Sequence, residues 1–258
     1  GSDFAIGSRL SAPRVLSPAA LALLASMNLP QARVARRPDV AIIATGDELV
    51  MPGEDPRPDQ IVASNAFGLK ALLDLVGARC RIMPIARDTL PALQAVLGAA
   101  ADADLILTIG GASVGDHDLL GTQAEALGLS RNFYKVSMRP GKPLMAGRIG
   151  EVPLIGLPGN PVSALVCGTV FVAPVLRRML GLPAEPTPRA QAILAEDIPA
   201  NGPREHYARA TLGPDGVRVF NRQDSSLLTV LSAADALVVR PPHAPAAAAG
   251  TPVEMIRL

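Results

Sequence analysis

The chain has 258 residues, of which 49% are hydrophobic, and its 24 basic and 23 acidic side chains leave a net charge of +1. This length is enough for one or two domains with a substantial core. The balanced charge argues against binding to nucleic acid or to an acidic membrane, and five Phe, two Tyr and no Trp offer few rings on which bases could stack.

Residues 1–36 are expected to be a short lead-in with one helix at residues 18–29, where apolar side chains recur at helical spacing. From residue 37 the pattern changes to strands that alternate with helices. Residues 40–44 are a continuous apolar run, which is typical of a strand buried on both faces of a parallel sheet, and residues 105–109 are expected to be another buried strand. Further strands are expected at residues 79–86, 133–138, 144–149 and 152–157, and helices between Ser64 and Gly77, at 90–101, before Leu127 and at 162–180. Residues 37–181 are therefore predicted to form an α/β domain with a doubly wound, mostly parallel sheet.

Residues 182–258 have a different pattern. A linker rich in proline leads into short strand-like runs separated by turn residues, with the runs expected at residues 190–194, 207–212, 217–220, 236–239 and 253–256. This pattern predicts a small all-β domain, either a barrel or a sandwich.

Localisation is predicted from what the sequence lacks. The first residues have neither the basic nor the apolar segment of a signal peptide. The most apolar stretch, residues 162–174, is shorter than the roughly 20 residues that cross a membrane. Cys80 and Cys167 lie outside any metal-ligand or redox spacing, so both are expected to be buried, reduced thiols. We therefore expect a cytoplasmic protein with no membrane partner.

Acidic side chains follow three of the predicted strands. Asp47 and Glu48 come after the first strand, Asp88 after the second, and Asp118 after the third. In an open parallel sheet the carboxyl ends of the strands meet at one edge, where ligands bind. Carboxylates gathered there repel one another unless they hold a cation, and hard oxygen ligands suit Mg²⁺. Each acid could instead simply cap a helix.

Other loops at the same edge suit an anion. Gly110 and Gly111 allow backbone N–H groups to approach it, Ser113 adds a hydroxyl, and Arg139 and Lys142 add positive charge. Glycines also occur in ordinary turns. Taken with the acids, the pattern predicts a phosphorylated or oxyanionic substrate bridged by metal. Neither the Walker motif nor the Gly-x-Gly-x-x-Gly motif occurs, so an ordinary nucleotide or NAD site is not expected.

A serine hydrolase is one alternative. Residues 111–115, Gly-Ala-Ser-Val-Gly, fit the nucleophile elbow of α/β-hydrolases, with Ser113 as nucleophile. Such an enzyme needs a later histidine on the same sheet, but His206 and His243 both fall in the β-rich tail. Labelling of Ser113 by a fluorophosphonate would distinguish this alternative.

Five motifs, in order along the chain, resemble those of the molybdopterin molybdotransferases, the MoeA family, to which the gephyrin E domain is also similar. The motifs are Thr45-Gly46-Asp47-Glu48-Leu49, Gly110-Gly111-Ala112-Ser113-Val114-Gly115, Asp118, Pro140-Gly141-Lys142-Pro143 and Leu157-Pro158-Gly159-Asn160-Pro161-Val162-Ser163. The resemblance implies Mg²⁺-dependent insertion of molybdate into adenylylated molybdopterin with release of AMP.

The resemblance also implies roles for individual residues. Catalytic roles fall on Glu48, Asp88, Asp118, Pro158 and Pro161, with the three acids also at the metal. Substrate binding falls on Thr45, Gly46, Gly110, Gly111, Ser113, Arg139, Lys142, Asn160 and Ser163.

Family members begin far upstream, with a dimerisation region and an inserted domain. By resemblance, residues 1–36 are expected to be the end of that region, in a chain that is either a fragment or a short relative. A homodimer is then expected, with the upstream molybdopterin adenylyltransferase as a further partner. Because gephyrin-like relatives also act as scaffolds, a non-catalytic molybdopterin-binding or scaffold module is the other alternative.

Overall fold

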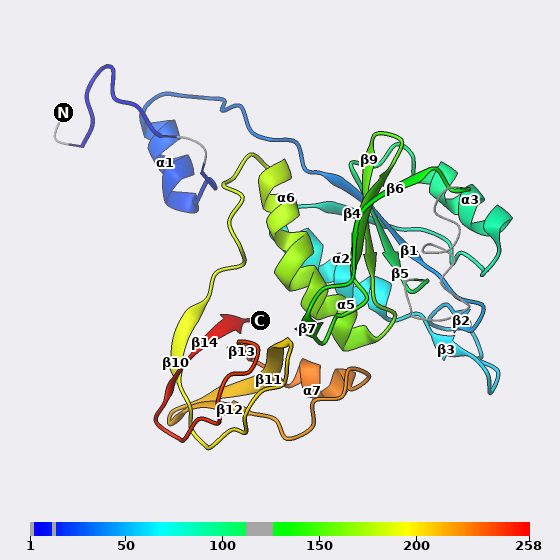
Figure 1. Cartoon of the computed structure of the whole chain (residues 1–258). Helices are drawn as coiled ribbons and strands as arrows, with labels where there is room; N and C mark the ends of the chain where they lie inside the picture. Colours follow the sequence, from blue (N-terminus) through cyan, green and yellow to red (C-terminus); the bar gives the residue numbers. More distant parts are fainter. Residues whose placement is uncertain (1–2, 12–13, 112–125) are drawn as a thin grey trace.

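A computed structural model describes residues 3–11, 14–111 and 126–258. Its larger domain is built on a six-stranded sheet (Figure 1). Across the sheet the strands are β4 (Arg79–Ile82), β1 (Asp39–Ala44), β5 (Leu105–Ile109), β9 (Val152–Leu157), β8 (Met145–Ile149) and β6 (Leu129–Tyr134). The first four are parallel, β8 pairs antiparallel with β9, and β6 pairs antiparallel with β8. The prediction of an α/β fold with a mostly parallel sheet is confirmed.

The alternation of side chains along β1 gives this sheet two covered faces. Val40 and Ile42 belong to one hydrophobic cluster, and Ala41 and Ile43 to another. Helix α2 (Asn65–Val76) supplies the first cluster, and helix α3 (Leu90–Ala99) supplies the second. Both faces are therefore buried, which explains why β1 is apolar from Val40 to Ala44 and β5 is apolar except for Thr108.

Local sequence signals set the ends of these helices. Gly77 ends α2 with φ +110°, a conformation that favours glycine. Thr89 caps α3, because its hydroxyl oxygen accepts a hydrogen bond from the N–H of Ala92 at 3.4 Å. Ser64 precedes α2 as expected, but its own backbone is helical and its side chain makes no cap bond.

The third helical stretch is a core element. It comprises α5 (Pro161–Cys167), a π-helical turn (Gly168–Val172) and α6 (Ala173–Met179). Among the described residues it is the one helix long and apolar enough to cross a membrane, at 19 residues and mean hydropathy 1.5, but 56% of its apolar window is buried. A Cβ on Gly168 would lie 2.7 Å from Leu69 of α2, so the two helices pack in close contact. We read the stretch as the central helix of the hydrophobic core.

The second sheet carries the C-terminal domain. Its strands lie in the order β10 (Ala190–Ile193), β14 (Pro252–Arg257), β13 (Ala236–Arg240), β11 (Glu205–Gly213) and β12 (Gly216–Val219), all antiparallel. A bridge between Leu194 and Val217 links the two ends, so the sheet closes into a small barrel. A short helix, α7 (Leu228–Ser232), was not predicted.

The two sheets are joined by a strand that the sequence places wrongly. Residues 133–138 were expected to form one strand, but β6 ends at Tyr134 and Lys135 turns the chain with φ +72°. The next strand, β7 (Met138–Arg139), pairs in parallel with β11 of the second sheet. β4 is also shorter than predicted, with a single bridge from Thr45 to Ala86 beyond it.

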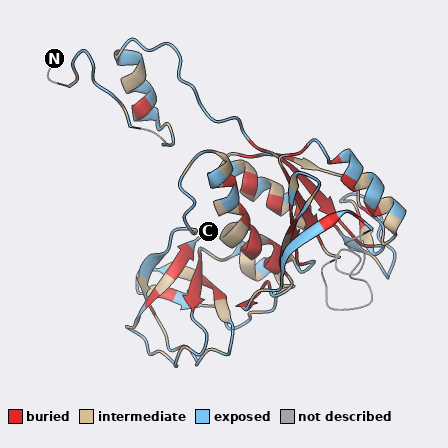
Figure 2. Cartoon of the chain, turned by 45° about the horizontal axis from the view of Figure 1, so that its top comes forward, coloured by how far each residue is buried: buried red, intermediate tan, exposed pale blue. Residues whose placement is uncertain are grey.

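The N-terminal segment stands apart from both sheets (Figure 1). Helix α1 (Pro18–Ser26) begins where the hydroxyl of Ser17 accepts a hydrogen bond from the N–H of Ala20 at 3.2 Å. Figure 2 shows this segment mainly exposed, and Ala20 is the only buried residue among those described before Arg37. The domain boundaries at residues 36 and 181 stay a prediction.

Candidate substrate site

A cavity of about 840 Å³ opens where the loops after β1 and β5 diverge. From β1 the chain passes to β4 on one side and then to β5 on the other, so this is the point at which the order of strands reverses. Such points bind ligands in open α/β sheets. The cavity is within the size range of small-molecule sites. Nine of the residues nominated from the sequence line it: Thr45, Gly46, Glu48, Asp88, Gly110, Gly111, Pro158, Asn160 and Pro161.

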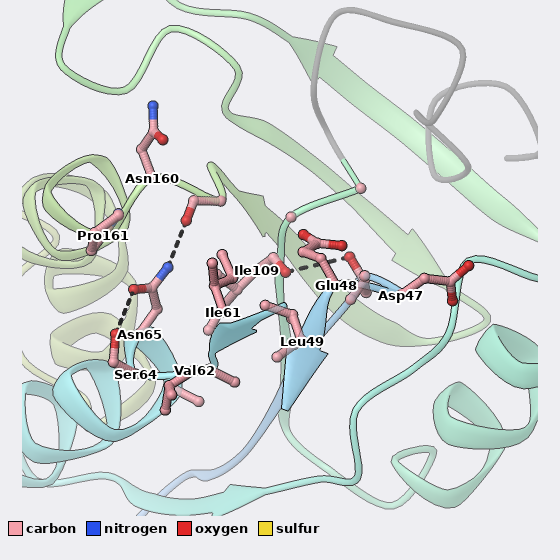
Figure 3. Close-up of a pocket in the computed structure, with 18 of the residues that line it drawn as sticks. Asp47, Glu48, Leu49, Ile61, Val62, Ser64, Asn65, Ile109, Asn160 and Pro161 are labelled. Carbon is pink, nitrogen blue, oxygen red and sulfur yellow. Dashed lines mark hydrogen bonds between the residues drawn. The ribbon is translucent and has the colours of Figure 1, made fainter. Parts of the chain in front are cut away.

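The two acids that follow β1 point in different directions (Figure 3). Glu48 curls back over Gly46, close enough that a Cβ on Gly46 would overlap its carboxylate. Asp47 turns away from Asn65 and Asn160, and its Oδ1 accepts a hydrogen bond from the N–H of Asp88 at 3.0 Å. Asp47 therefore fastens one loop to the next, whereas Glu48 faces the cavity.

Arg87 strengthens this fastening. Its Nη1 donates to three backbone carbonyls of the loop that carries Glu48, those of Gly46 at 3.3 Å and of Asp47 and Leu49 at 3.0 Å. Arg87 and Asp47 together link the two loops in both directions. The cavity-lining acids Glu48 and Asp88 are thus held relative to each other by their sequence neighbours.

Glycine is required at the end of β5. Gly110 has φ +89°, and a Cβ there would lie 2.8 Å from the carbonyl oxygen of Thr45. The hydroxyl of Thr45 donates to the carbonyl of Ile109 at 3.3 Å, across the same gap. The loops after β1 and β5 therefore approach more closely than any other residue would permit.

The loop before α5 forms the opposite side of the cavity. Asn65 at the start of α2 donates from Nδ2 to the carbonyl of Gly159 at 2.7 Å. Asn160 donates from its side chain to the hydroxyl of Ser225 at 3.0 Å, and the N–H of Val162 donates to the carbonyl of Ser225 at 3.1 Å. The loop is therefore held by α2 on one side and by the C-terminal domain on the other.

Three nominated residues that the structure describes do not line the cavity. Ser163 is buried within α5, at 4% exposed. Arg139 is exposed on β7, and Lys142 is exposed next to Pro143, which does line the cavity. Their assignment to substrate stays a prediction, as does that of Ser113 and Asp118, which lie outside the described residues. The described residues contain no group of three or more His, Cys, Asp or Glu side chains that could hold a metal ion.

Arg209 on β11 is a candidate that the sequence did not indicate. Its side chain is fully buried, with Nε bonded to Oε1 of Gln223 at 3.0 Å and Nη1 to the carbonyl of Asp224 at 2.7 Å. Its Nη2 is buried without a hydrogen-bond partner in the described part of the chain, and burial lowers the pKa of the guanidinium. Asp224 precedes Ser225, so this cation lies behind the loop that carries Asn160.

The histidines that a serine hydrolase would need lie in the C-terminal domain. His206 lies on β11, and His243 lies in the loop after β13. Neither is among the described residues that line the cavity.

Comparison with known proteins assigns the fold to a family. Residues 41–178, more than half of the chain, match the family described as "Probable molybdopterin binding domain". The chain belongs to this molybdopterin-binding family. Residues 191–258 match the "MoeA C-terminal region (domain IV)", which is the barrel domain. A crystal structure of a molybdopterin biosynthesis moeA protein from Pyrococcus horikoshii superposes with a TM-score of 0.80 and 30% identity, over 93% of this chain and 59% of that one.

Curated relatives of this chain share one name, molybdopterin molybdenumtransferase. A molybdopterin molybdenumtransferase from a Nostoc species is 38% identical over 90% of the chain and 56% of its own length. Molybdopterin molybdenumtransferase 2 from Mycobacterium tuberculosis is 34% identical over 99% of the chain and 65% of its own length. The chain therefore spans between half and two thirds of the length of these relatives.

Proposed function

We propose that this chain carries the site at which molybdate is inserted into adenylylated molybdopterin, with release of AMP. The observation that carries the proposal is the cavity at the reversal of strand order, with acids on one side and a glycine-rich, anion-compatible loop on the other. The membership in a molybdopterin-binding family and the name of the curated relatives support it. The reaction belongs to the biosynthesis of the molybdenum cofactor, and we expect it in the cytoplasm.

The donor set at the cavity suits Mg²⁺. Glu48 and Asp88 both line it, and Mg²⁺ is usually held by one or two carboxylates together with phosphates of the substrate. We assign these two residues to the metal, with Asp118 as the third acid. Bound Mg²⁺ would neutralise the charge that develops on the phosphate leaving group.

The remaining residues of the site bind and orient the substrates. Gly110 and Gly111 present backbone without side chains, so a phosphate can approach the N–H groups of their loop. Thr45 and Gly46 form the facing wall, and Pro158 and Pro161 stiffen the opposite loop. Asn160, Ser163 and Ser113 add polar groups.

Oxyanion binding is assigned to the cations. Lys142 and Arg139 are exposed, so they would meet molybdate or phosphate at the surface. Arg209 is buried with one nitrogen unbonded within the described chain, and a buried guanidinium of this kind binds an oxyanion strongly because water does not compete. We place molybdate within reach of these side chains.

The relatives are longer than this chain, so the complete activity is proposed for a protein that also has the upstream region. A homodimer and the adenylyltransferase that makes the substrate are the proposed partners.

The test is molybdate-dependent release of AMP from adenylylated molybdopterin, with and without Mg²⁺. Glu48→Gln removes one charge at constant size, so turnover should fall at least tenfold, about 1.4 kcal/mol in barrier. The matched control is Glu151→Gln, whose side chain is 98% exposed on a turn outside the cavity. Binding of the substrate without any turnover would favour the non-catalytic scaffold, and equal activity of the Glu48 variant would remove this acid from the site.

A further inference from the structure

A histidine and an arginine lie side by side in the C-terminal barrel. His206 on β11 and Arg240 on β13 are direct partners in the antiparallel register. Residues two apart on a strand point to the same face. Ala208 and Val238 follow that rule and belong to the core cluster inside the barrel. His206 and Arg240 therefore point into one end of the barrel, on the face of β11 opposite to Arg209.

Both side chains have a buried nitrogen that no described residue satisfies. These atoms are Nε2 of His206 and Nη1 of Arg240. Arg240 is only 7% exposed, and its other terminal nitrogen donates to the carbonyl of Pro245. Buried polar atoms in proteins almost always have a partner, and an uncompensated buried charge is costly. Two such nitrogens at the same place point to an acceptor that the chain itself does not supply.

The charge around His206 has a single sign. Burial, together with the positive charges of Arg139, Arg209, Arg240 and Arg204, lowers the pKa of His206 to about 4. Arg139 is the register partner of His206 across β7 and β11. Arg139 and Arg204 are both exposed, and their charges act on His206. Together these side chains make a positive potential that attracts anions.

The loops that cover this end of the barrel are fixed by one amide. Nδ2 of Asn201 donates to the carbonyls of Arg204, Arg240 and Pro241, at 2.9, 3.0 and 2.7 Å. The backbone N–H of Asn201 donates to the carbonyl of Ala244 at 2.8 Å. The frame around the two unsatisfied nitrogens is therefore ordered in advance, which reduces the entropy lost when a ligand binds.

We propose that His206 and Arg240 form a binding site for a tetrahedral oxyanion, the class that includes sulfate, phosphate and molybdate. Nε2–H of His206 and Nη1 of Arg240 each donate a hydrogen bond to an oxygen of the anion, and Arg139 and Arg204 flank it. Hydrogen bonds between a cation and an oxyanion are about twice as strong as neutral ones. None of these four residues is among the described lining of the cavity between β1 and β5, and the proposal does not rest on the proposed function, with which it shares only Arg139.

The experiment titrates the chain with sodium sulfate at constant ionic strength. The chain has three histidines, so the ring signal of His206 can be assigned and followed by NMR, with His243 as the internal reference. Sulfate should shift the signal of His206 saturably and raise its pKa by at least one unit, because an anion favours the charged imidazole. Phosphate and molybdate should compete with sulfate at the same site.

Variants give the second measurement. Calorimetry should show sulfate affinity reduced at least tenfold in Arg240→Gln and in His206→Phe, which keeps a ring but removes both nitrogens. The control is Arg218→Gln, an exposed arginine of the same barrel, which should bind sulfate as the parent does.

Three results would overturn the proposal. One is a His206 signal that does not respond to sulfate in the parent chain, a measurement that requires no variant to fold. The second is an equal loss of affinity in Arg218→Gln, which would mean diffuse attraction by surface charge. The third is binding of molybdate without binding of sulfate or phosphate.

Discussion

Replacing Arg87 with alanine is the sharpest perturbation of the candidate substrate site, because Arg87 touches the loop that carries Glu48 without lining the cavity itself. One of its nitrogens donates to three carbonyls of that loop, at 3.0, 3.0 and 3.3 Å. A nitrogen with two hydrogens makes the equivalent of two full bonds. At this exposed position each contributes roughly 0.5–1 kcal/mol, so the variant should lose about 1–2 kcal/mol. For a chain of this size the melting temperature should fall by roughly 2–4 °C per kcal/mol.

The effect on ligand binding separates positioning from simple stability. If ligand binding must order the loop again, the same free energy lowers the affinity for AMP or adenylylated molybdopterin by roughly five- to thirtyfold. Calorimetry with AMP and thermal unfolding would be measured on Arg87→Ala, on Arg87→Lys and on Arg79→Ala, an exposed arginine at the start of β4. Arg87→Lys keeps the charge but not the planar fork, so it should rescue little.

A double-mutant cycle provides the decisive comparison. Because Arg87 acts through Glu48, the combined variant Arg87→Ala with Glu48→Gln should lose less than the sum of the two single losses. The reasoning is refuted if Arg87→Ala binds as the parent does, if Arg79→Ala has the same defect, or if the two losses in the cycle simply add.

The remaining predictions concern backbone geometry and pH. Gly110→Ala should lower the free energy of unfolding by about 1–3 kcal/mol in denaturant titrations, because the new Cβ would lie 2.8 Å from a backbone carbonyl oxygen at φ +89°. The control is Gly98→Ala, in open space on α3, which should raise the free energy of unfolding by about 0.5–1 kcal/mol. A similar loss in both variants would contradict the steric argument. Gly141→Ala would place a Cβ 2.6 Å from Sγ of Cys167, so adding Cys167→Ala should restore part of the lost stability; no recovery would mean that backbone strain alone is responsible. The pKa of His206 is lowered from its ordinary value of 6.5 to about 4. Between these two pH values the unfolded chain binds a proton that the folded chain does not, so the free energy of unfolding, measured without oxyanions, should be highest above about pH 6.5 and fall toward pH 4. His206→Phe should flatten that slope in denaturant titrations, and an unchanged slope would show that other groups cause it.

Local pattern was sufficient for the elements that lie inside the larger sheet. The runs at residues 40–44 and 105–109 are apolar on both faces except for Thr108, which is typical of strands buried on both sides. Gly77 and Thr89 likewise act through their own backbone neighbours. Such features depend on a few adjacent residues, which is why the sequence predicts them.

Pairing between distant segments could not be predicted in this way. Nothing in the sequence near β7 shows that Met138 would pair with Glu205, a residue of a different sheet. Arg209 was missed for the same reason, since its hydrogen-bond acceptors belong to Gln223 and Asp224, and an isolated arginine in a strand normally indicates an exposed face. Arg139 and Lys142 were assigned together because one predicted loop carries both, and that assignment stays a prediction.

The cavity depends on the C-terminal domain because the loop before α5, which lines the cavity, is hydrogen-bonded to that domain. The loop that holds Asn160 is bonded to Ser225 by both a side chain and the backbone, and residue 224 in turn holds Arg209. Tyr207, Leu237, Val239 and Ile256 of the barrel belong to the same hydrophobic cluster as the strands of the larger sheet. A loop held from both sides cannot be set by the larger sheet alone. The barrel domain therefore helps to position a loop that lines the candidate substrate site, although the described lining itself comes from the larger domain, and the geometry of the loop before α5 depends on how closely the two domains pack.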